Sequence, residues 1–177
     1  MAHIGSSTEP SSGNIILIGM PGAGKSTLGV VLAKVLNYDF LDADLVIQKR
    51  YGKTLQQIID TEGSESFIEA ESEVLRGLGA SKTIIATGGS AVYSDEAMRH
   101  LATLGTVVYL QVSYEDMTKR LQDLHERGVV LKEGSGRGLR GLYDERRPLY
   151  EKYADITVNI DKLSITDAAR KVVASVK

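Results

Sequence analysis

Short strand-like runs alternate along this chain with longer segments whose apolar residues recur at helical spacing. The short runs lie at residues 14–18, 39–41, 83–86, 106–110 and 156–160. Apolar runs of this length are typical of strands that are buried on both faces, as in a parallel sheet. Because strands and helices alternate, the sequence predicts an α/β fold with a mainly parallel sheet.

The longer segments predict the helices. They cover residues 28–36, 45–78, 95–103, 113–125 and 142–153, and a last helix starts at Ser164, whose hydroxyl is expected to cap it. The segment 45–78 is expected to break near Gly52 and again at Gly63, because glycine weakens a helix. Between residues 126 and 141 apolar residues are few and glycines are dense, which indicates a mobile excursion.

A glycine-rich segment separates the first strand from the first helix. Residues 19–27 read Gly-Met-Pro-Gly-Ala-Gly-Lys-Ser-Thr, which fits the P-loop pattern. Its backbone N–H groups and the following helix N-terminus are expected to bind the phosphates of ATP. Lys25 is predicted to contact the β- and γ-phosphates, and Ser26 to ligate Mg²⁺. The residues expected to hold the nucleotide here are Gly22, Ala23, Gly24, Lys25, Ser26 and Thr27.

Two aspartates follow the second strand, at the edge where ligands gather in open α/β sheets. Asp42 and Asp44 flank Ala43, and residues two apart on a strand point to the same face. Both carboxylates are expected to face the phosphate site. One can hold Mg²⁺, and the other can accept a hydrogen bond, or the proton, from an acceptor hydroxyl. The alternative is that they cap the next helix and complement its dipole.

Glycines and arginines further along the chain add candidates. Gly88 and Gly89 follow the third strand, where the lack of side chains lets the backbone approach a ligand; a simple turn is the alternative. Arg120, Arg127 and Arg146 surround the glycine-rich excursion. Phosphoryl transfer needs cations around the phosphate oxygens, and a closing lid can deliver them while excluding water. The alternative for any one of them is a solvated surface cation.

Composition and charge narrow the range of partners. The chain has 177 residues, a net charge of −2, no basic block and no cysteine. It therefore suits one domain, with neither disulfides nor a thiolate zinc site, and nucleic acid is not an expected partner. No apolar run approaches the roughly 20 residues that span a bilayer. We expect residues 14–177 to form a single kinase domain after a flexible tail at residues 1–13, in a cytoplasmic monomer.

Nearly all of the sequence from Ile15 to the C-terminus resembles the shikimate kinase family of P-loop kinases. Beside the P-loop, the resemblance is carried by Phe40-Leu41-Asp42-Ala43-Asp44, Arg50, Gly52, Glu62-Gly63, Phe67, Glu71, Gly88-Gly89, Thr106-Val107-Val108-Tyr109-Leu110 and Glu145-Arg146-Arg147-Pro148-Leu149-Tyr150. It implies a three-layer αβα P-loop fold with a five-stranded parallel sheet of order 2-3-1-4-5. It also implies a lid at about residues 124–141 and an acceptor-binding helical region at about residues 44–78.

The activity that this resemblance implies is Mg²⁺-dependent transfer of the ATP γ-phosphoryl group to the 3-hydroxyl of shikimate, a small hydroxy acid. This step belongs to chorismate and aromatic amino acid biosynthesis. On the acceptor side, the resemblance implies that Asp42 lies near Mg²⁺ and that Asp44 binds the substrate hydroxyls and acts as base. It further implies that Gly89 contacts the substrate and that Arg146 binds the substrate carboxylate.

On the nucleotide side, the resemblance implies that Arg120 lies against the adenine and that Arg127 is the lid arginine. The expected catalytic residues are therefore Lys25, Asp44 and Arg127.

The chain departs from the family pattern at three places, all on the acceptor side. Ile68 stands where the family has an arginine that pairs with the substrate carboxylate, and Ser90 replaces the third glycine of a triplet. Residues 127–131 read Arg-Gly-Val-Val-Leu where the lid usually reads Arg-Pro-Leu.

Two alternative functions stay open. One is a related P-loop kinase with another acceptor, such as a gluconate-like polyol or a nucleotide. The other is a regulatory module that binds ATP without transferring a phosphoryl group.

Overall fold

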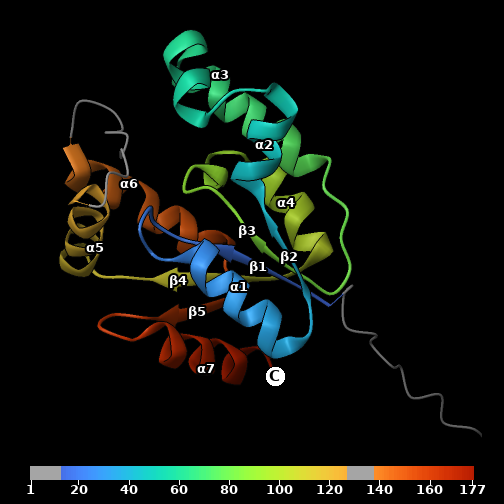
Figure 1. Ribbon diagram of the computed structural model, residues 1–177, viewed down its shortest axis with the longest axis vertical. Helices are drawn as coiled ribbons and strands as arrows, with labels where there is room; N and C mark the ends of the chain where they lie inside the picture. Colours follow the sequence, from blue (N-terminus) through green and yellow to red (C-terminus); the bar gives the residue numbers. More distant parts are fainter. Residues whose placement is uncertain (1–12, 127–137) are drawn as a thin grey trace, which may run out of the picture.

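The computed structural model describes residues 13–126 and 138–177, except for the side chains of residues 124–126, and it is built around one parallel sheet (Figure 1). The sheet has five strands in the order β2-β3-β1-β4-β5. Its strands are β1 (Asn14–Ile18), β2 (Asp39–Asp42), β3 (Thr83–Ala86), β4 (Gly105–Gln111) and β5 (Ile156–Asn159). The predicted fold class and strand order are confirmed.

The helices lie close to their predicted positions. They are α1 (Lys25–Leu36), α2 (Ala43–Tyr51), α3 (Leu55–Arg76), α4 (Asp95–Leu104), α5 (Tyr114–Glu126), α6 (Gly138–Tyr153) and α7 (Ile165–Val176), with a 3-10 turn η1 (Ala91–Tyr93). Both predicted breaks are present: Gly52 ends α2 in a left-handed conformation, and Gly63 is non-helical within α3. The Ser164 hydroxyl caps α7 by accepting from Asp167 N at 3.1 Å.

One boundary was predicted wrongly. Helix α6 begins at Gly138, whereas the sequence pattern placed residues 138–141 in an irregular excursion. The helix starts earlier because Leu139 packs against the main core and Leu142 is buried in it, so the apolar face begins before residue 142. Most of the predicted lid, including Arg127, lies outside the described residues, as does nearly all of the predicted tail.

Two apolar cores organise the molecule. The main core surrounds β1, in which Ile16, Leu17 and Ile18 are fully buried. A smaller core joins α2 to α3 through Ile47, Ile58, Phe67 and Val74. Burying each such side chain contributes about 1.5–3 kcal/mol. The α2–α3 pair therefore has its own packing, and Figure 1 shows it projecting beyond one end of the sheet.

The carboxyl ends of the central strands meet at one edge of the sheet. Leu17 of β1 pairs with Ala86 of β3 and Val108 of β4, and Asp42 of β2 pairs with Ala86. Thr87, which follows β3, ties its loop to β1, because its backbone N and Oγ1 donate to Leu17 O at 3.2 and 3.0 Å. The loops after β1, β2 and β3 are thereby gathered at this edge, where open α/β sheets bind ligands.

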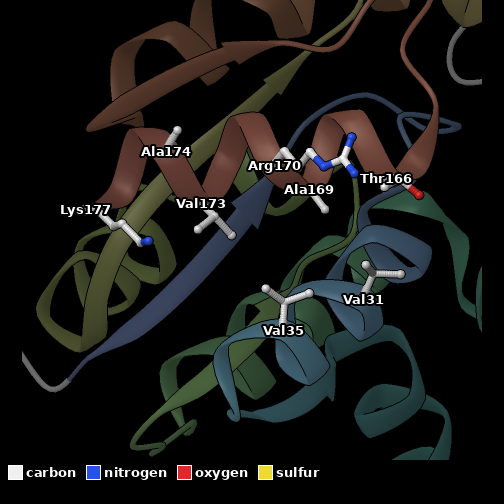
Figure 2. Close-up of a pocket in the computed structure, with 8 residues that line it drawn as sticks. All are labelled: Val31, Val35, Thr166, Ala169, Arg170, Val173, Ala174 and Lys177. Carbon is white, nitrogen blue, oxygen red and sulfur yellow. The ribbon is translucent and has the colours of Figure 1, made fainter.

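An apolar groove of about 510 Å³ lies elsewhere, between α1 and α7 (Figure 2). Val31 and Val35 line it from α1, and Ala169 and Val173 line it from α7. None of the predicted site residues lines it.

None of the helices in residues 13–126 and 138–177 combines the length and apolar character that crossing a bilayer requires.

Candidate active site

The P-loop forms an open turn between β1 and α1. Gly22 and Gly24 have φ values of 77° and 88°, in the left-handed region that favours glycine. Gly24 caps the N-terminus of α1, and Ser26 and Thr27 are exposed in its first turn. A glycine-rich loop that leads into a helix N-terminus is an anion site, so the residues present fit the phosphates of a nucleotide.

The Lys25 side chain reaches back to the start of the P-loop. It is 8% exposed, and its Nζ donates to Gly19 O at 2.8 Å and to Met20 O at 3.0 Å. Burial lowers the pKa of Lys25 to about 8, and the nearby Asp44 carboxyl opposes that effect. The ammonium group is thus held in place before any ligand arrives.

Ser26 and Asp42 meet beside the P-loop. Ser26 Oγ donates to Asp42 Oδ2 at 2.6 Å, while Asp42 Oδ1 accepts from Asp44 N at 2.9 Å. Asp42 therefore caps α2 with one oxygen, as the capping interpretation expects, and contacts the P-loop serine with the other.

The Ser26 hydroxyl and the Asp42 carboxylate are compatible with Mg²⁺ as ligands. No cluster of three or more acidic or histidine side chains that could hold a metal exists within residues 13–126 and 138–177. Mg²⁺ at a nucleotide site takes only one or two protein ligands, because water and phosphate oxygens complete its octahedron. A hydroxyl and a carboxylate 2.6 Å apart fit that requirement.

Asp44 occupies a different setting from the one predicted. Strand β2 ends at Asp42, so Asp44 lies in the first turn of α2 and not two residues along a strand. Its carboxyl still faces the site: Oδ1 is buried without a hydrogen-bond partner and would lie 3.0 Å from a Cβ added at Gly88. Burial, and then Asp42, raise the pKa of Asp44, while Lys25 lowers it.

The Gly88-Gly89 pair is packed against charged side chains. A Cβ on Gly89 would lie 2.8 Å from Arg146 Nη1 and 3.2 Å from Pro21 Cδ, and one on Gly88 would collide with Glu71 Oε1. The lack of side chains on this pair lets Glu71, Arg146 and Pro21 approach the backbone closely, and the predicted approach to a ligand stays a prediction. Gly89 O also accepts from Tyr150 OH at 2.6 Å, which fixes the loop to α6.

Glu71 belongs to this site; it was one of the residues that carry the family resemblance, but the sequence assigned it no chemical role. It is 1% exposed on α3, its Oε2 accepts from Ser90 Oγ, and its Oε1 has no partner. Burial raises the pKa of Glu71 to about 7 against the opposing effect of the Ser90 hydrogen bond. A helical glutamate gives no sequence signal of burial, since most glutamates are solvated.

Four side chains of the site interact electrostatically, and we call them the charged cluster: Lys25, Asp44, Glu71 and Arg146.

Arg120 lies on the other side of the P-loop. Its Nη1 donates to Ala23 O at 3.3 Å and its Nη2 to Ile160 O at 3.0 Å, and it forms an ion pair with Asp116. Among the residues that the structure describes, those predicted to bind the nucleotide and those predicted to bind the acceptor thus lie at the same edge of the sheet. Arg127 is outside the described residues.

The buried Glu71 carboxyl predicts a pH dependence of stability. Because its folded pKa of about 7 exceeds the ordinary 4.5, the stability that its proton provides is full below pH 4.5 and is lost as pH rises through 7. Glu71→Gln is neutral at every pH, so its melting temperature relative to wild type should rise between pH 5 and 8. Glu69→Gln, at an exposed position on the same helix, is the control. A relative melting temperature independent of pH would contradict the assignment.

The P-loop, the parallel sheet and the charged cluster at its carboxyl edge define a phosphotransferase of the P-loop kinase class. A family model described as shikimate kinase matches residues 21–177. The chain therefore belongs to the shikimate kinase family.

Individual relatives agree with this assignment. A shikimate kinase of Legionella pneumophila (strain Corby) is 39% identical over 161 residues, which are 90% of this chain and 92% of that protein. Shikimate kinase 1 of Erwinia tasmaniensis is 40% identical over 164 residues, 92% of each chain. The solved structure of shikimate kinase from Acinetobacter baumannii in complex with shikimate matches with a TM-score of 0.80 at 34% identity, over 90% of each chain.

Proposed function

We propose that this protein transfers the γ-phosphoryl group of ATP to the 3-hydroxyl of shikimate. The observation that carries the proposal is the buried Oδ1 atom of Asp44, which has no hydrogen-bond partner and lies beside Gly88 and near Lys25. A buried carboxylate oxygen without a donor is costly, and a substrate hydroxyl supplies the donor. Membership of the shikimate kinase family supports shikimate as the acceptor.

The P-loop is proposed to bind the nucleotide. The backbone of residues 22–27 would hold the phosphates, and the Arg120 guanidinium, anchored beside Ala23, would lie against the adenine. Lys25 would stabilise the negative charge that develops on the phosphoryl oxygens in the transition state. Ser26 and Asp42 would hold Mg²⁺, which supplies charge neutralisation on the phosphates when bound.

Asp44 is proposed to orient the acceptor hydroxyl and take its proton. As the hydroxyl oxygen forms a bond to the γ-phosphorus, the bond from that phosphorus to the bridging oxygen breaks and ADP leaves. Burial raises the pKa of Asp44, which brings this carboxyl closer to the pKa of an effective general base. Arg146 and Gly89 would hold the substrate carboxylate and ring.

A coupled assay of ADP release tests the proposal. Shikimate should support rapid ADP release with MgATP, while gluconate, homoserine and nucleoside monophosphates should give little. Turnover with one of these other acceptors and none with shikimate would favour the related kinase. ATP binding without turnover on any acceptor would favour a regulatory module.

The Asp42→Asn variant is expected to need more Mg²⁺. Losing one negative charge beside Ser26 weakens the metal site, so the Mg²⁺ concentration for half-maximal activity should rise by roughly tenfold, about 1.4 kcal/mol. A titration of activity against free Mg²⁺ at fixed ATP measures the shift. An unchanged Mg²⁺ requirement would remove Asp42 from the metal site.

One observation favours a different acceptor as the second candidate function. Ile68 packs against the small core of α2 and α3 and cannot pair with an anion. A less anionic polyol would not need a second cation at this position.

The Ile68→Arg variant separates the two acceptors. If shikimate is the natural acceptor, its KM should change by less than about tenfold, or ~1.4 kcal/mol, because the wild-type site already binds the carboxylate. If the acceptor is a less anionic polyol, shikimate kcat/KM should rise by at least about that factor. Steady-state kinetics with both proteins distinguish the outcomes.

We also propose that the protein works as a cytoplasmic monomer without nucleic acid or membrane partners. The net charge of −2 and the lack of a basic block in the sequence support the part of this proposal that concerns nucleic acid. Light scattering of the purified protein at micromolar concentration tests the monomer: a dimer mass there would contradict it.

A further inference from the structure

The Arg146 guanidinium is held from one side by a directed chain of hydrogen bonds. Arg146 Nε donates to Tyr93 OH at 3.2 Å, and Arg146 Cζ lies 5.2 Å from the centre of the Tyr93 ring. The single phenol proton of Tyr93 is donated to Glu145 Oε1 at 2.9 Å. A lone pair of the phenol oxygen therefore faces Arg146, and the chain ends on a carboxylate.

The other side of the same guanidinium faces the loop that follows β3. A Cβ on Gly89 would lie 2.8 Å from Arg146 Nη1, so this nitrogen touches the space that Gly89 leaves open. No ion pair joins Arg146 to a carboxylate among the residues that the structure describes. A guanidinium presents its N–H donors in a rigid planar fork. With Nε bonded to Tyr93 and a further hydrogen bond to Tyr150, the guanidinium keeps N–H donors on its terminal nitrogens for an incoming anion.

Among the described residues that line the groove beside Tyr93, none is a second unpaired cation. Tyr93 and Ile68 line the same groove, of about 660 Å³. Its charged lining residues are Glu62, Glu69, Glu73 and Arg76, and Arg76 is paired with Glu96 at 2.9 Å. The described lining of this groove thus leaves Arg146, which is bonded to Tyr93, as the cation available to an anionic acceptor, and its usefulness depends on how well its fork is oriented before binding.

We propose that Tyr93 is a positioning residue that orients the Arg146 fork toward the acceptor carboxylate and thereby determines acceptor specificity. The inference rests on the proposed function, since it concerns the carboxylate of that acceptor. Its physical basis is preorganisation: a long arginine side chain that is already fixed loses less freedom when it binds. A charge-assisted hydrogen bond to Nε provides that fixation.

Tyr93→Phe tests the inference, because it keeps the ring over Arg146 and removes only the hydroxyl. The KM for shikimate should rise by about 10- to 150-fold, the range for a lost hydrogen bond to a charged group. The kcat and the KM for ATP should stay within about twofold, because the reacting groups and the P-loop are untouched. Tyr153→Phe is the matched control: its hydroxyl donates to Asp95 Oδ1 at 2.7 Å, and it should leave all three parameters unchanged.

Two further measurements separate positioning from a general structural role. In an Arg146→Lys background, which lacks the fork, adding Tyr93→Phe should change the KM for shikimate by less than about twofold. With shikimate methyl ester, which has no carboxylate charge, Tyr93→Phe should likewise have no effect. Additive losses in the double variant, or an equal effect on acid and ester, would overturn the inference.

The wild-type protein distinguishes failure of this inference from failure of the proposed function. No wild-type turnover of shikimate would overturn the function itself. Normal wild-type turnover with an unchanged KM in Tyr93→Phe would overturn only the role of Tyr93. If Tyr93→Phe does not fold, Glu145→Gln weakens the same chain from its exposed end and should raise the KM for shikimate by about 2- to 5-fold. An unchanged KM in that variant would equally contradict the inference.

Discussion

Replacing Lys25 with methionine is expected to lower kcat by at least about 100-fold, the loss typical of removing one preorganised electrostatic donor. The ammonium group is already held by Gly19 O and Met20 O before ligand binds, so its charge is in place when negative charge develops on the leaving phosphoryl group. Methionine keeps an unbranched side chain of similar length and removes the charge. Coupled ADP release at saturating ATP and shikimate measures the effect.

The control for this experiment is Lys34→Met, the same substitution at an exposed position of α1. It should leave kcat unchanged and the protein folded. Near-normal turnover in a folded Lys25→Met protein would show that the P-loop is not the catalytic centre.

The second large effect is expected from Asp44→Asn. An amide cannot take the proton of the acceptor hydroxyl, and general-base catalysis contributes about 10²- to 10⁴-fold, so kcat should fall within that range. The dissociation constant for ATP should change little, because Asp44 contacts neither the P-loop glycines nor Ser26 through any hydrogen bond of the described residues. Kinetics combined with ATP-binding calorimetry separate the two quantities.

Asp39→Asn is the matched control, since Asp39 begins the strand that Asp42 ends and its side chain is exposed. It should behave as wild type. If Asp42→Asn and Asp44→Asn lose ATP affinity equally, the proposed division between metal binding and acceptor activation is wrong.

Much of the fold could be predicted because its signals are local. A buried parallel strand such as β1 reads as a continuous apolar run, and the P-loop fixes the strand–loop–helix order around it. The helix breaks at Gly52 and Gly63 were visible for the same reason. The start of α6 was missed because Gly138 and Gly141 weaken the helical signal, and the packing of Leu139 and Leu142 overrides it.

The acceptor-binding part of the site was harder to predict from the sequence. The closeness of Asp44 to Gly88 depends on where β2 ends, and a shift of one residue along a strand reverses the direction of a side chain. Glu71 contributed to the family resemblance without an assigned role, and Tyr93 belongs to no motif. Their importance comes from contacts with Ser90 and Arg146, which lie 19 and 53 residues away along the chain.

The most direct test of the central claim is the wild-type kcat/KM for shikimate with saturating MgATP, measured beside gluconate under the same conditions. We predict a value of at least about 10⁴ M⁻¹s⁻¹, the low end for enzymes acting on their own substrates, and a much smaller value for gluconate. A shikimate value well below about 10⁴ M⁻¹s⁻¹, exceeded by another acceptor, would contradict the account.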